Sequence, residues 1–197
     1  MPVGIGQLLN WGSPWQTAAG TVLNTATTAT ISPQAPGPQD FPVATAYLYY
    51  GSTLRITASG ILTTTATSTT ATIFATAGSG PTTLCTPVGL TTGTTVITGI
   101  QWLWESYHTI IQAGASTGNT ISSFGKLSLF NSGAGLPANP IALTATPGMA
   151  LAAPNSAGDT VAAVSTAVAM PIMLRGTLAG ANATIQCNRF LVEHLYA

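Results

Sequence analysis

The chain has 197 residues, of which only four are Lys or Arg and four are Asp or Glu, so its formal net charge is zero. About a quarter of the residues in an ordinary soluble domain are charged, and a net charge near zero favours association between copies. This composition argues against a basic surface for nucleic acid and leaves few groups for acid–base, metal or phosphate chemistry. It favours a chain that works inside an assembly.

A chain of this length suits one domain, and its 46% hydrophobic residues can build a core. We expect no signal peptide, because residues 1–15 hold no basic segment and no unbroken apolar stretch. No window approaches the roughly 18 consecutive apolar residues of a transmembrane helix, and no cationic amphipathic segment appears. We therefore expect no membrane contact.

Residues 1–17 are predicted to form a short extended N-terminal arm, and residues 18–197 a single β domain. The arm is rich in Gly and Pro, yet it carries Leu8, Leu9, Trp11 and Trp15. Apolar side chains on an arm need cover, so we expect them to pack on their own domain or on a neighbouring subunit.

The first part of the domain reads as extended segments separated by turns. Residues 20–31 are Thr-rich and extended, and the four prolines between Ser32 and Pro42 predict a surface loop. From Leu54 to Leu62 apolar and polar residues alternate, which predicts a half-buried strand. Arg55 falls on the face opposite Leu54 and Ile56.

The longest strand signal lies in the middle of the chain. After a strand at residues 72–76, a long strand is predicted from residue 95 to residue 111. Its alternation places two sets of residues on opposite faces, and both faces are mixed in polarity. Such a strand suits a core on one side and a partner on the other. The first face holds Trp102, Trp104, Ser106, His108 and Ile110, and the second Leu103, Glu105, Tyr107, Thr109 and Ile111.

The remaining elements are also strands. Residues 121–130 are predicted to form a hairpin with the preceding strand, and shorter strands are expected at 141–144, 160–168, 172–178 and 184–193. No segment beyond residues 1–9 has a convincing helical period. Eight to ten short strands between Gly/Pro loops predict an all-β sandwich or barrel.

No constellation of residues predicts an enzyme. A glycosidase needs two carboxylates around the bond it cleaves, but Glu105 and Glu193 are expected to pair with arginines. A Ser or Cys nucleophile needs an oriented His, and His108 and His194 are expected to be structural or exposed. We therefore predict no catalytic residues, no cofactor and no metal.

Two further sets of residues have a structural and a functional interpretation. Cys85 and Cys187 are expected to be free thiols rather than a disulfide, with Cys187 buried at strand spacing. The aromatic residues could stack on sugar rings, but packing in the core and between subunits is the favoured interpretation. They are Tyr47, Tyr49, Tyr50, Trp102 and Trp104.

Several stretches resemble a group of small virion proteins of tailed bacteriophages, especially those of actinobacteria. They are AGTVLNTATTATISP, YGSTLRITASGILTTTATSTTATI, WLWESYHTII and ATIQCNRFLVEHL. The likeness covers about residues 19–193. The matching residues are Ala19, Gly20, Thr21, Gly51, Thr53, Leu54, Arg55, Gly60, Trp104, Glu105, Cys187, Leu191, Val192 and Glu193.

The resemblance implies a jelly-roll-like antiparallel β-sandwich that forms a homotrimer on the virion. The implied role is a capsid decoration or cementing protein, which is assembled in the host cytoplasm and binds the major capsid protein on the outside of the head. The alternative is a minor tail or tail-tip protein that binds a host receptor or glycan. The residues expected at an assembly interface are Leu8, Leu9, Trp11, Trp15, Tyr49, Tyr50, Trp102 and Trp104.

Overall fold

A computed structural model describes fourteen strands and no helix within the part of the chain it covers. The described residues are 7–8, 20, 22–32, 41–43, 48–77, 82–84, 88–92, 96–112, 120–130, 141–143, 150–152, 160–162 and 170–195. Their strands form two antiparallel sheets with a hydrophobic core between them, so the prediction of an all-β sandwich is confirmed.

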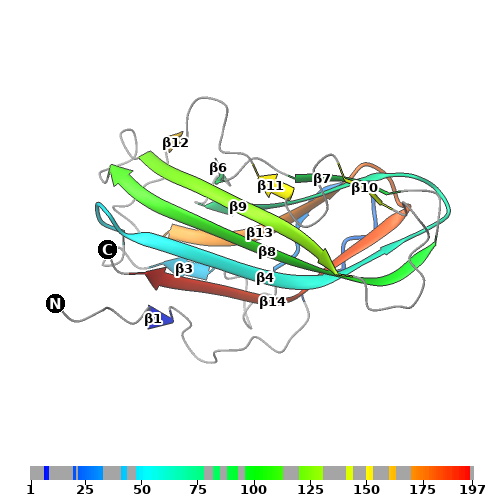
Figure 1. Cartoon of the computed structure of the whole chain (residues 1–197), viewed down its shortest axis with the longest axis horizontal. Coiled ribbons are helices and arrows are strands. Elements are labelled where there is room, and N and C mark those ends of the chain that lie inside the picture. The colour runs from blue at the N-terminus through cyan, green and yellow to red at the C-terminus, as the bar shows by residue number, and fades with distance from the viewer. Residues whose placement is uncertain are drawn as a thin grey trace.

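Sheet A contains the four longest strands, which lie in front in Figure 1. They are β14 (Ala183–Leu195), β4 (Thr53–Thr64), β8 (Ile97–Gln112) and β9 (Thr120–Phe130), in that spatial order. Short strands extend both edges. β1 (Gln7–Leu8) pairs with β14, so part of the N-terminal arm lies at a sheet edge, while β11 (Ala150–Ala152) and β12 (Thr160–Ala162) pair with β9.

Sheet B lies behind sheet A and is centred on β5 (Thr70–Ala77) and β13 (Met170–Leu178), which pair with each other (Figure 1). β7 (Val88–Thr92) and β6 (Thr82–Thr83) pair with β5, and β10 (Ile141–Leu143) pairs with β7. On the far side, β2 (Thr28–Thr30) and β3 (Phe41–Val43) pair with β13.

Alternation along the strands builds the core, because successive side chains of a strand point to opposite faces of its sheet. The burial of β4 alternates without a break, and every inward residue of β8 from Trp102 to Ile110 is buried. Trp102 and Trp104 are 1% and 0% exposed. The predicted division of this strand into two faces is therefore confirmed for the core side.

Two of the connections between the sheets are held together by backbone hydrogen bonds at one end of the sandwich. The Thr65 amide donates to the Asn182 carbonyl at 2.9 Å, and the Ala179 amide donates to the Thr70 carbonyl at 2.9 Å. One connection joins β4 to β5 and the other joins β13 to β14. These bonds tie sheet A to sheet B where the chain crosses between them.

Two details differ from the sequence-based expectations. Pro42 lies inside β3, opposite Pro171, so the predicted loop ends earlier than expected; β3 pairs only with β13 among the described strands, and such an edge tolerates proline. The register of β14 against β4 also shifts between Cys187 and Arg189, a β-bulge that the sequence analysis did not predict although Gly60 stands opposite Cys187.

Candidate functional site

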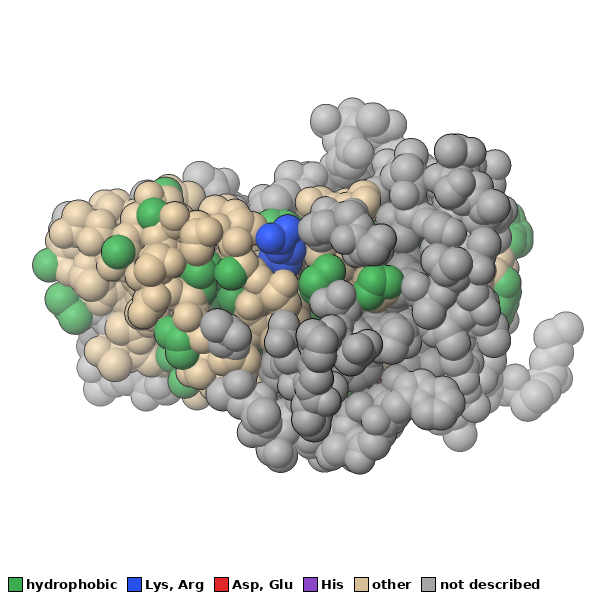
Figure 2. Space-filling model, turned by 180° about the vertical axis from the view of Figure 1, so that it is seen from behind, with side chains coloured by type: hydrophobic (Ala, Val, Ile, Leu, Met, Phe, Trp, Pro, Cys, Tyr) green, Lys and Arg blue, Asp and Glu red, His purple; other side chains and the backbone are tan. Residues whose placement is uncertain are grey.

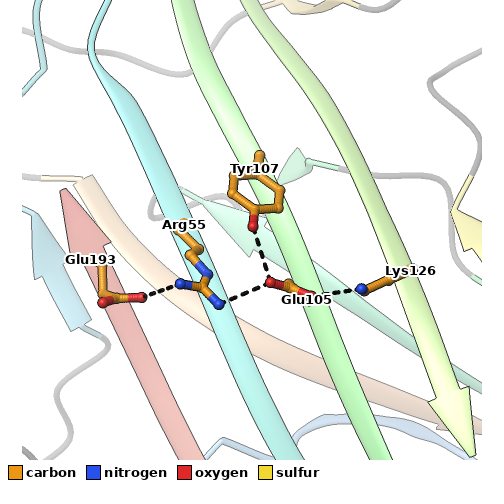
Figure 3. A network of polar contacts seen from close by, with 5 residues as sticks. All are labelled: Arg55, Glu105, Tyr107, Lys126 and Glu193. Atoms are coloured by element: carbon orange, nitrogen blue, oxygen red, sulfur yellow. Dashed lines mark hydrogen bonds and ion pairs between the residues drawn. The ribbon is translucent and has the colours of Figure 1, made fainter. Parts of the chain in front are cut away.

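Four charged side chains form a row across the outer face of sheet A, one from each of its long strands (Figure 3). We call Glu193, Arg55, Glu105 and Lys126 the charged row. They come from β14, β4, β8 and β9 in that order, so the charges alternate in sign across the sheet. Half of the eight charged residues of the chain are therefore gathered on one face.

The contacts within the charged row are short. Arg55 Nη2 lies 2.9 Å from Glu105 Oε1, Arg55 Nη1 lies 3.5 Å from Glu193 Oε2, and Lys126 Nζ lies 3.0 Å from Glu105 Oε2. The Tyr107 hydroxyl also donates to Glu105 Oε1 at 3.0 Å. The predicted pairing of both glutamates with arginine is thus confirmed, and the arginine is Arg55.

The environment of Glu105 favours its ionised form. The hydrogen bond from Lys126 contributes most to lowering the pKa of this carboxyl, and the hydroxyl of Tyr107 and the charge of Arg55 add to it, against the opposing effect of burial. Burial and the bond to Glu105 raise the pKa of Tyr107. A carboxylate fixed in this way is poorly suited to give or take a proton near neutral pH.

An aromatic pair stands beside the charged row. The rings of Tyr107 and Phe124 are stacked with centroids 4.9 Å apart and planes 14° apart, and the guanidinium of Arg55 lies 5.9 Å from the centroid of Tyr107. Phe124 is 57% exposed. A shallow pocket of about 210 Å³ lies between this pair, Glu105 and Lys126.

A second polar group is closed inside the sandwich. The Trp104 indole donates to the Ser106 hydroxyl at 2.9 Å, His108 Nε2 lies 2.8 Å from the same hydroxyl, and His108 Nδ1 lies 2.7 Å from the hydroxyl of Ser123. Burial lowers the pKa of His108 to about 3. Serine beside histidine is typical of a nucleophile and its base, but these side chains are at most 3% exposed and no substrate reaches them.

The other titratable residues of interest are buried as well. His194 is buried, Nε2 lies 2.9 Å from the hydroxyl of Ser52, and burial lowers the pKa of its imidazole. Cys187 is a buried free thiol, as predicted, and burial raises its pKa to about 12. No group of three or more His, Cys, Asp or Glu within the described ranges could hold a metal ion.

The residues predicted for an assembly interface fall into four groups. Tyr49 and Tyr50 are 41% and 74% exposed just before β4, whereas Trp102 and Trp104 fill the core, so an assembly surface on the folded subunit does not include these two rings. Leu8 lies in β1 at the edge of sheet A. The remaining three lie outside the described residues, as do Tyr47 and Cys85; they are Leu9, Trp11 and Trp15.

The comparisons with known proteins identify no relative. No family model, curated protein or solved structure matches the chain. The described part of the chain also contains no helix of the length and hydrophobicity needed to cross a bilayer. The function is therefore inferred from the residues of this chain.

Sequence reasoning did not identify the charged row or the aromatic pair as a unit. It placed Arg55 on the outward face of its strand and put Glu105 and Tyr107 together on one face of the long central strand. Their assembly, however, depends on β4 lying beside β8, with Arg55 opposite Tyr107. The signal present in the sequence is that the predicted strands containing Glu193, Arg55, Glu105 and Lys126 each place a charged residue among mostly uncharged residues.

Proposed function

We propose that this chain is a non-enzymatic virion structural protein, a decoration protein that forms homotrimers on the outside of a bacteriophage head and cements the shell. The proposal is based on one observation: the few charged and titratable groups of the chain are paired with each other or buried. In the described structure, Glu105 and Glu193 are bound by basic side chains, and His108 and Cys187 are buried. Such groups stabilise a scaffold and are poorly placed for catalysis.

The described outer surface supports a role in contact rather than in chemistry. Threonine hydroxyls face each other across strands, as between Thr53 and Thr109 at 2.9 Å and between Thr28 and Thr177 at 2.7 Å. Figure 2 shows the side opposite sheet A, where polar uncharged atoms and scattered hydrophobic side chains make up most of the described surface. Burying a surface with so little charge against a neighbour costs little desolvation free energy.

The proposed mechanism is physical. Three subunits bury uncharged faces against one another, and the trimer spans junctions between copies of the major capsid protein. β1 pairs with β14 of its own chain, so the part of the arm proposed to reach a neighbour is the one that carries Trp11 and Trp15. Binding to the closed shell stabilises that shell by linkage, since the open shell lacks the composite site. We also propose that the strands of the sandwich are connected in the order of a jelly roll.

Attachment of this kind should depend weakly on salt, because screening acts mainly on exposed charges. Purified heads washed from low to about molar salt should keep the protein at a fixed ratio to the major capsid protein, measured by quantitative mass spectrometry. Hundreds of copies in heads would support decoration. Release by salt, or a few copies confined to tails, would contradict it.

Native mass spectrometry should also show a complex of three 19.9-kDa chains.

The exposed pair Tyr49 and Tyr50 favours a second candidate, a tail-tip protein that binds a host receptor or glycan. Tyrosine rings on a loop stack on apolar sugar faces. Tyr50→Ala is the cleaner variant, because Tyr49 also packs edge-on against His194 at 5.7 Å. Saturable binding to host cells that is lost in Tyr50→Ala and kept in Val96→Ala, another exposed apolar position, would favour this function.

A further inference from the structure

The charged row has a property that its internal ion pairs do not require. From β14 to β9 its charges are negative, positive, negative and positive, and their sum is zero (Figure 3). Read in the opposite direction, every position carries the opposite sign. A row of this kind is complementary to its own reversed copy.

A two-fold axis in the plane of a face-to-face contact produces that reversal. By the register, Glu193 lies level with Arg55, whereas Glu105 and Lys126 lie level with each other two residues further along the strands, so the row crosses the strands obliquely. If the axis passes through the middle of the row and is perpendicular to it, Glu193 faces Lys126 of the second copy and Arg55 faces its Glu105. A two-fold contact joins one patch to itself, so each of these pairs occurs twice.

The rest of the face also suits burial. Phe124 protrudes beside the row, and Leu191 and Leu195 of β14 point outward on the same face and are half-buried. Four strands about 4.8 Å apart and about 40 Å long present roughly 750 Å², close to the roughly 800 Å² per partner of a stable interface. All four charges of the row keep some solvent exposure.

We propose that the outer face of sheet A binds the same face of a second copy of this chain about a two-fold axis, with the charged row set against its own reverse. The contact does not depend on the virion assignment. It also differs from a trimer contact, which joins two different patches.

Charge-swap variants test the proposal. Lys126→Glu and Glu193→Lys each place like charges opposite one another, twice per pair, and each should weaken self-association about tenfold. An equimolar mixture of the two variants restores opposite charges at every position, and so does the double variant within one chain. With one variant labelled with ¹⁵N, native mass spectrometry should show mixed pairs in excess over pairs of either variant alone.

Arg175→Glu is the matched control, because it makes the same change of net charge as Lys126→Glu but lies in sheet B. It should associate like the wild type, whereas Phe124→Ser should associate more weakly. Recovery on mixing cannot arise from damage to each fold separately. The proposal is overturned if wild type forms no even-numbered species at high concentration, or if the mixture associates no better than its components. A trimer unaffected by either swap would overturn it too, and would leave the proposed virion function standing.

Discussion

Acidification from pH 7 to pH 3 should remove about 4 to 5 kcal/mol of the free energy of unfolding through His108 alone. Desolvation by burial lowers the pKa of this imidazole from 6.5 to about 3 in the folded chain. Between these values the unfolded chain binds the additional proton. Stability is therefore complete above about pH 6.5 and falls by about 1.4 kcal/mol per pH unit below it.

The contacts of His108 explain why the folded protein resists protonation. Both ring nitrogens already lie within hydrogen-bonding distance of hydroxyls, from Ser106 and Ser123, and the ring is 1% exposed between the sheets. Both of these hydrogen-bonding partners are hydroxyls rather than carboxylates, so a charged imidazole would gain no ion pair from them. Its protonation is coupled to opening of the sandwich.

Urea denaturation at a series of pH values measures this coupling. The wild-type slope of unfolding free energy against pH should exceed that of His108→Gln by about 1.4 kcal/mol per unit between pH 5.5 and pH 3.5. His194→Gln is the matched comparison, because burial also lowers the pKa of His194. An unchanged acid slope in His108→Gln would show that this histidine does not control acid unfolding.

The sequence predicted which side chains share a face of a strand more easily than it predicted which strands lie side by side. Alternation placed Trp104 and His108 on one face of the strand and Glu105 and Tyr107 on the other, because the period of a strand is two and the division into faces follows from local sequence. The prediction that Trp102 and Trp104 lie at an assembly interface was wrong, because a face of mixed polarity does not show which side of the strand meets the core.

The sequence could not predict which distant residues pair with each other, because their pairing depends on the spatial order of the strands. Arg55 and Glu105 are fifty positions apart and meet only because β4 lies between β14 and β8. Three arginines were equally available to each glutamate until that order was fixed. The β-bulge after Cys187 belongs to the same class, because one extra residue in β14 is defined only against the register of β4.

The bulge lies beside the residue for which we expect the most severe single substitution. Gly60 of β4 stands opposite Cys187 on one side and Trp102 on the other. A Cβ at this position would overlap the carbonyl oxygen of Gln186 and lie 2.5 Å from Cζ2 of the Trp102 ring. A backbone carbonyl and a buried indole have little freedom to move, so the strands would have to separate.

Gly60→Ala should therefore lower the free energy of unfolding by about 2 to 3 kcal/mol, measured by urea denaturation at neutral pH. Gly180→Ala is the control, because its nearest neighbours, Thr69 and Asn182, lie 3.3 and 3.4 Å from the added Cβ and are side-chain atoms in a turn. That variant should stay within about 0.5 kcal/mol of wild type. If Gly60→Ala were as stable as Gly180→Ala, the close approach of β4 to β14 at the bulge would be wrong, and with it the register that brings Glu193 to Arg55.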